Sequence, residues 1–165
     1  MSQETKSLTS LSQNEVDNMI NSFNNVDPDK INKILNNYSN CLSKMIAFTL
    51  SVVKKNGDED EIIEIEHLKR IIALCPIEER IIRTKDKVWD SREHILNRNA
   101  DYFLNRDYSN MIKNDQNQAM IETLIDAVKN NYNKLSKEEK EYYWNGTIKM
   151  LKYVIEFKKI TGDYN

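Results

Sequence analysis

The chain has few of the residues that build sheets, tight turns and covalent cross-links. Of its 165 residues, only three are glycine, two are proline and two are cysteine. Because glycine and proline punctuate strands and turns, their scarcity argues against a β-sandwich or an α/β sheet with many short loops. Cys41 and Cys75 stand alone, without a CxxC pair or a nearby histidine, which argues against a disulfide framework and a zinc site.

The chain also lacks a segment suited to crossing a membrane or directing export. The most apolar run, residues 41–53, contains Lys44 and is shorter than the roughly 20 residues that a helical span needs. The N-terminus is polar and has no apolar signal core. We therefore expect no membrane span, and two free thiols in a reducing compartment.

The common motifs of active sites are missing as well. The sequence contains no Walker loop, GxGxxG, GxSxG or HExxH, and three glycines cannot form a phosphate loop. Neither His67 nor His94 is followed by a second ligand at i+3 or i+4. The acidic residues 58–61 lack the spacing of an EF-hand loop, so we interpret them as the first turn of a helix. We expect no catalytic residue, cofactor or metal, and an enzyme built from scattered carboxylates is only a third hypothesis.

Helical periodicity is what the sequence does contain. Two capping boxes, Ser12-Gln-Asn-Glu15 and Ser136-Lys-Glu-Glu139, and the pair Asp27-Pro28 mark helix starts. Gly57 and Gly162 fit left-handed helix ends. The apolar spacing predicts helices over about residues 12–23, 28–56, 58–74, 77–96, 118–132 and 136–159.

These helices predict an all-α fold. An apolar content of 39% suffices for one core, so we expect a single-domain bundle of about six helices over residues 12–162, with a disordered arm at residues 1–11. The second helix is apolar over most of its circumference from Leu42 onward and is predicted to be the most buried. On the last helix, the lysines Lys149, Lys152, Lys158 and Lys159 are expected on the outer face.

The stretch NADYFLNRDY, residues 99–108, is the candidate functional segment. Its aromatic residues cannot all be solvated comfortably, so we interpret it as a loop that either plugs a gap in the bundle or meets a partner. Tyrosine and arginine are frequent in the hot spots of protein interfaces. The predicted partner-binding residues are Tyr102, Phe103, Arg106 and Tyr108.

A basic stretch offers an alternative site. Residues 80–106 carry seven basic and four acidic side chains, although the whole chain has a net charge of −2 and no strong positive excess. The alternative function is a nucleic-acid-binding accessory protein that uses one basic helix. Its predicted contact residues are Arg80, Arg83, Lys87, Arg92 and Arg98.

Two stretches of the chain resemble small uncharacterised helical proteins of large nucleocytoplasmic DNA viruses, the giant viruses. These are WDSREHILNRNADYFLNRDY, residues 89–108, and LIDAVKNNYNKLSKEEKEYYW, residues 124–144. The similarity extends over about residues 77–155. This chain has Asn99-Ala100-Asp101-Tyr102-Phe103 where the pattern has a more acidic approach to paired phenylalanines. The resemblance implies a viral protein made in an infected cell, and it implies no activity or functional residue.

The leading hypothesis is therefore a non-enzymatic viral protein that acts through protein–protein contacts. It would serve as a virion component, an assembly factor or a modulator of a host protein, located in the host cytoplasm or the virion. Its partner would be a viral or host protein. The sequence leaves the oligomeric state open.

Overall fold

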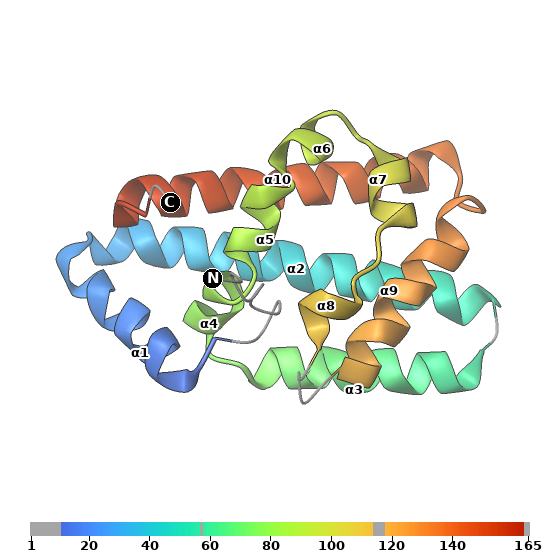
Figure 1. Ribbon diagram of the computed structural model, residues 1–165, viewed down its shortest axis with the longest axis horizontal. Coiled ribbons are helices and arrows are strands. Elements are labelled where there is room, and N and C mark those ends of the chain that lie inside the picture. Colours follow the sequence, from blue (N-terminus) through green and yellow to red (C-terminus); the bar gives the residue numbers. More distant parts are fainter. Residues whose placement is uncertain (1–10, 57, 114–117, 164–165) are drawn as a thin grey trace.

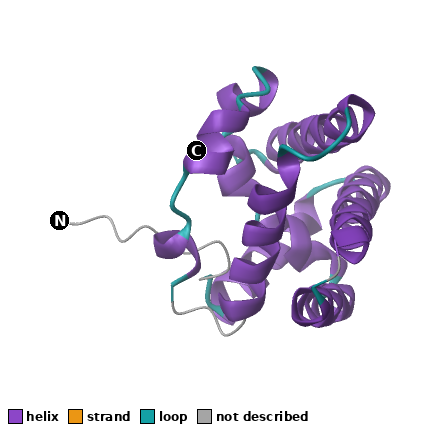
Figure 2. Ribbon diagram, turned by 90° about the vertical axis from the view of Figure 1, so that its right-hand side faces the viewer, coloured by secondary structure: helices purple, strands orange, loops and turns teal. Residues whose placement is uncertain are grey.

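The computed structural model describes residues 11–56, 58–113 and 118–163. Over these residues the chain consists of helices and loops, without a strand (Figure 2). The predicted all-α, single-domain fold is confirmed. The arm predicted at residues 1–11 falls, except for Leu11, outside the described residues, and so does the helix end predicted at Gly57.

In the described part of the chain, helices of 10 to 29 residues occur together with shorter ones, and Figure 1 shows their arrangement. The elements are α1 (Gln13–Ser22), the 3-10 turn η1 (Phe23–Asn25), α2 (Pro28–Asn56), α3 (Glu59–Leu74), α4 (Ile77–Ile82), α5 (Lys85–Asp90), α6 (Arg92–Leu96), α7 (Ala100–Asn105), α8 (Ser109–Ile112), α9 (Gln118–Tyr132) and α10 (Lys137–Thr161).

The longest helix, α2, lies between α10 and α3, and it runs antiparallel to both (Figure 1). These three helices form one layer, and the shorter helices pack across one of its faces (Figures 1 and 2). The contacts of α2 extend to α3, α4, α9 and α10. α2 is therefore the central helix of the bundle.

The helix boundaries follow local signals in the sequence. Both predicted capping boxes are present: the Ser12 hydroxyl accepts from the Glu15 amide, and the Ser136 hydroxyl accepts from the Glu139 amide. Each glutamate carboxylate in turn accepts from the backbone amide of its serine, which satisfies two free N–H groups at once. Gly162 ends α10 with φ of 71°, a conformation that glycine adopts without strain.

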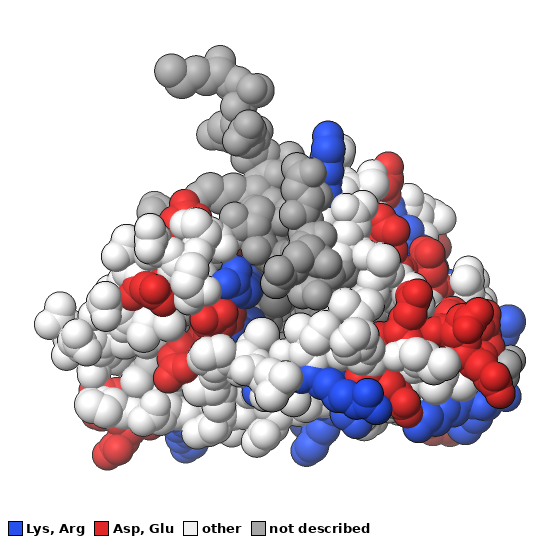
Figure 3. Space-filling model, turned by 90° about the horizontal axis from the view of Figure 1, so that it is seen from below, with Lys and Arg blue, Asp and Glu red and all other residues white. Residues whose placement is uncertain are grey.

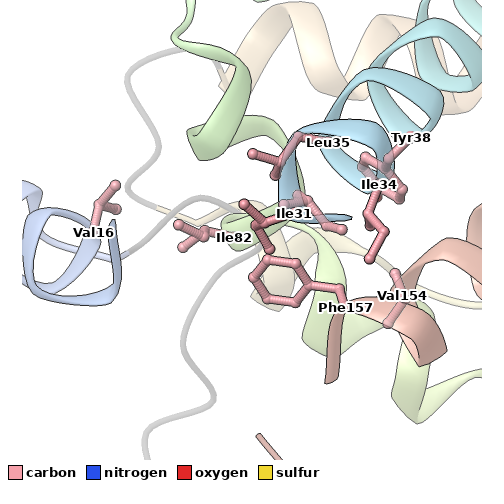
Figure 4. Packing of buried hydrophobic residues seen from close by; sticks show 9 residues of the cluster. Val16, Ile31, Ile34, Leu35, Tyr38, Ile82, Val154 and Phe157 are labelled. Carbon is pink, nitrogen blue, oxygen red and sulfur yellow. The ribbon is translucent and has the colours of Figure 1, made fainter. Parts of the chain in front are cut away.

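The hydrophobic core has two parts along α2. The first joins α1, α2, α4 and α10, and Figure 4 shows its side chains converging from these helices. Its buried members are Val16, Ile31, Ile34, Leu35, Tyr38, Ile81, Ile82, Val154 and Phe157. The second part joins α2, α3 and α9 through Ile46, Leu50, Val53, Ile65 and Ala127.

The predicted fourth helix, residues 77–96, is interrupted twice. It consists of α4, α5 and α6, separated at Arg83–Thr84 and at Ser91. The Thr84 hydroxyl donates to the Arg80 carbonyl at 2.8 Å, a bond that bends helices. Lys85, the first residue of α5, is buried. The break before it places its ammonium group beside the Asp163 carboxylate, just after the end of α10.

One lysine of α10 departs from the prediction. Lys149, Lys152 and Lys159 are exposed as expected, but Lys158 is buried beside the Trp89 ring, with its Nζ 5.3 Å from the ring centroid. The expectation that Lys158 lies on the outer face is wrong, because α5 covers this part of α10 and supplies the Asp86 carboxylate as a charged partner.

Acidic side chains gather at the end of the molecule where α3 begins, on the right of Figure 3. Asp58 caps α3, and its carboxylate accepts from the amides of Asp60 and Glu61. The predicted role of residues 58–61 as a helix start is confirmed. Among the described residues, no helix combines the length and apolar character needed to span a membrane.

Candidate partner-binding site

Residues 99–108 are predicted as a loop, but they form a short helix, α7, followed by three residues of irregular structure. The backbone of Arg98 has a φ of 50°, so the chain reverses there after α6. Asn99 then caps α7, with its side-chain oxygen accepting from the Tyr102 amide at 3.2 Å. The helix places Tyr102 and Arg106 four residues apart, on one face.

Phe103 points toward the bundle. Its ring centroid lies 6.0 Å from that of Trp144 on α10, and Trp144 is buried. The Trp144 indole N–H donates to the Tyr132 hydroxyl of α9 at 2.8 Å. Phe103 therefore anchors α7 where α9 and α10 meet. This packing corresponds to the first of the two predicted alternatives, in which the segment fills a gap in the bundle.

Tyr102 stacks on His94 and accepts a hydrogen bond from Arg106. The Tyr102 ring stacks on the His94 ring, with centroids 3.5 Å apart and planes 4° from parallel. Arg106 Nη1 donates to the Tyr102 hydroxyl at 2.8 Å. The guanidinium carbon lies 5.2 Å from the Tyr102 ring centroid and 5.6 Å from that of Tyr108, within range of a cation–π interaction.

Tyr108 and α9 complete the cluster. The Tyr108 hydroxyl donates to the Phe103 carbonyl at 3.0 Å, and burial raises the pKa of this phenol. Lys129 of α9 donates to the Arg106 carbonyl at 2.7 Å, and its Nζ lies 5.1 Å from the Tyr108 ring centroid. We call Tyr102, Arg106 and Tyr108, with His94 and Lys129, the Arg106 cluster.

The structure thus brings together all four predicted residues. Each is half-buried, so each combines contacts inside the protein with some surface left to solvent. The sequence reasoning missed His94 and Lys129. His94 lies eight residues before Tyr102 and Lys129 lies on another helix, so only the reversal at Arg98 and the packing of α9 make them neighbours.

The Arg106 cluster is suited to recognition through planar surfaces and charge. Its tyrosines and arginine offer ring faces, a guanidinium and hydroxyl groups. The nearby Asp107 carboxylate accepts from the Ser109 amide at 2.9 Å, and this hydrogen bond lowers the pKa of Asp107. In the described part of the chain, no three His, Cys, Asp or Glu side chains are grouped so that they could hold a metal ion.

The residues of the nucleic-acid alternative are spread over α4 to α6 and the loop that follows, not along one helix. Arg80 donates to the Ala73 carbonyl at 3.0 Å and to the Ser39 hydroxyl. Arg83 forms an ion pair with Glu79 at 3.1 Å. Both guanidinium groups therefore bind partners within the chain.

The remaining three basic residues differ in their surroundings. Arg92 lies 4.3 Å above the Trp89 ring, and Arg98 forms an ion pair with Glu141 of α10. Lys87 has no carboxylate within 4.0 Å among the residues that the structure describes. Nucleic-acid binding stays a prediction, and steeply salt-dependent retention on DNA or RNA would test it.

Comparison of the chain with protein families, with curated proteins and with solved structures finds no match.

Proposed function

We propose that this chain is a non-enzymatic protein that binds another protein through the Arg106 cluster. The observation that carries the proposal is the preorganisation of Tyr102 and Arg106. Stacking on His94 and the 2.8 Å hydrogen bond hold these two side chains in place while part of each stays at the surface.

The physical reason is the entropy of association. Immobilising a flexible side chain at an interface costs about 0.5–1.5 kcal/mol. Here the chain itself already holds the arginine and both tyrosines, so a partner meets a surface that needs little ordering. Tyrosine and arginine are also enriched among the residues that dominate binding energies. Phe103 has a supporting role in this proposal, because it fastens the cluster to Trp144.

We further propose that the protein is viral, with a viral or host protein as its partner. The support is the resemblance over residues 77–155, a range that includes the Arg106 cluster. The protein would then be a virion component, an assembly factor or a modulator of a host protein, in the host cytoplasm or the virion. Mass spectrometry of purified virions, compared with the cytosol of infected cells, would distinguish these locations.

Affinity capture with matched variants tests the binding site. Arg106→Ala removes the guanidinium, and Tyr102→Ala removes the ring that orients it. Arg70→Ala is the control, because Arg70 is an exposed arginine on α3. We expect a partner that the wild type and Arg70→Ala enrich to be lost from both cluster variants, with far-UV circular dichroism unchanged. A partner that all four proteins retain equally would refute the proposed site.

A further inference from the structure

A groove runs along the contact between α2 and α10, away from the Arg106 cluster. It consists of two adjoining hollows of about 520 Å³ and 380 Å³ that share Lys44 and Tyr142. The larger hollow is also lined by Ala47, Phe48, Glu138 and Glu139. The smaller one includes Asn37, Asn40, Cys41, Asn145, Lys149 and Tyr153.

The smaller hollow is positively charged. Of the described residues that line it, Lys44 and Lys149 are basic and none is acidic. Neither ammonium group has a carboxylate within 4.0 Å among the residues that the structure describes. Cys41 lines the same hollow as both lysines. Burial raises the pKa of its thiol, and the charges of Lys149 and Lys44 act against that effect.

The same hollow offers neutral groups suited to a peptide backbone. Asn37, Asn40 and Asn145 line it, and each carboxamide can donate and accept hydrogen bonds. An extended peptide presents N–H and C=O groups that need such partners when they leave water. An acidic peptide can bind both the lysines, through its carboxylate, and the carboxamides, through its backbone. A free anion would bind the lysines alone, so this surface favours an acidic peptide.

The larger hollow is mostly apolar and ends in negative charge. The Phe48 ring lies 4.5 Å from Tyr142 and 5.0 Å from Tyr143, measured between centroids. Glu138 and Glu139 lie at the start of α10, and the Glu139 carboxylate is already bound to the Ser136 amide at 3.0 Å. An apolar side chain fits beside Phe48, whereas a second acidic residue would be repelled there.

We propose that the α2–α10 groove binds an extended acidic peptide of a partner protein, with a carboxylate at Lys44 and Lys149 and an apolar side chain beside Phe48. Cys41 and Phe48 are seven residues apart on α2, or about 10 Å at 1.5 Å per residue. An extended peptide covers this distance in about three residues. The recognised pattern is therefore acidic–x–x–apolar. This surface shares no residue with the Arg106 cluster, so the inference goes beyond the function proposed above and does not depend on it.

Fluorescence anisotropy of labelled peptides against the full chain tests the proposal. The probe peptide contains Glu-Glu-Ser-Ser-Leu, and the comparison peptide contains Lys-Lys-Ser-Ser-Leu. We expect only the acidic peptide to bind, more weakly as salt increases. The double variant Lys44→Glu/Lys149→Glu should lose about tenfold or more in affinity, since each surface ion pair contributes modestly and its reversal repels.

The control variant is Lys33→Glu/Lys159→Glu. It changes the same two helices and the net charge by the same amount, at exposed positions outside the groove, and should bind like the wild type. Amide chemical shifts of the wild type provide a second measurement that needs no variant, and changes should be confined to residues 37–48 and 138–153. The proposal is overturned if the acidic peptide fails to bind, if both double variants lose affinity equally, or if a twelve-residue oligothymidylate competes for the same site.

Discussion

Asp163, just after the end of α10, is expected to contribute strongly to stability. Its carboxylate accepts from Lys85 Nζ at 2.6 Å and lies 3.6 Å from Lys158 Nζ. The side chains of these two lysines are only 5% and 4% exposed. A second carboxylate, that of Asp86, is 56% exposed and lies 2.9 Å from Lys85 Nζ and 3.8 Å from Lys158 Nζ. Both buried cations thus lie within 4 Å of the Asp163 and Asp86 carboxylates.

The substitution Asp163→Asn keeps the shape of the side chain and removes its charge. Removing one partner of a buried ion pair costs about 3–5 kcal/mol, because the other charge stays buried without compensation. Asp163 is itself 28% exposed and Asp86 remains, so the expected loss in unfolding free energy is smaller, about 2 kcal/mol. For a chain of this size, that loss lowers the melting temperature by about 4–8 °C.

Urea denaturation followed by circular dichroism at 222 nm measures the loss. Asp90→Asn is the control, since Asp90 is an exposed aspartate at the end of α5. Adding Lys85→Met to Asp163→Asn should restore part of the stability, because the buried ammonium that lost its 2.6 Å carboxylate partner is then gone. A loss for Asp163→Asn below about 0.5 kcal/mol, equal to that of Asp90→Asn, would show that the buried lysines do not depend on this carboxylate.

Three further changes have expected outcomes. Burial raises the pKa of Tyr38 far above its usual value, so the folded state holds this proton when the unfolded state has lost it, and unfolding free energy should fall as pH rises above about 10. Tyr38→Phe should make urea midpoints at pH 8, 10 and 11 more nearly equal. Ser136→Ala removes the capping hydroxyl of α10 and should cost about 1 kcal/mol in urea unfolding, with Ser51→Ala as control. Phe103→Ala should cost about 1–2 kcal/mol, less than the 3–5 of a fully buried ring, and a thermal melt unchanged by it would contradict the inward packing of Phe103.

The helix ends were predictable because their causes are local. A serine and a glutamate three residues apart satisfy each other's backbone groups wherever they begin a helix, as Ser12 and Ser136 do. The breaks inside residues 77–96 have a distant cause. Lys85 binds Asp163, which is 78 residues away, and no pattern around Lys85 indicates a buried cation.

Three members of the Arg106 cluster, Tyr102, Arg106 and Tyr108, were predictable from the sequence, but the geometry of the cluster was not. Tyr102 and Arg106 are four residues apart, so one turn of helix brings them together. The prediction of a loop missed this turn, because six residues are too few for a periodic pattern to distinguish a helix. The orientation of Phe103 depends on Trp144, and that contact exists only once α9 and α10 have packed.

Gly146 lies inside α10, where it faces Met45 of α2. Inside a helix, glycine is about 1 kcal/mol less favourable than alanine, yet one of the three glycines lies in the middle of α10. A Cβ atom there would come within 2.1 Å of the Met45 sulfur on α2. Its absence lets the two helices approach until the Cys41 thiol donates to the Gly146 carbonyl at 3.2 Å and Thr49 bonds the Tyr143 hydroxyl at 2.6 Å. Because this close approach forms the floor of the α2–α10 groove, a residue that sequence rules treat as a helix breaker here determines the shape of a surface.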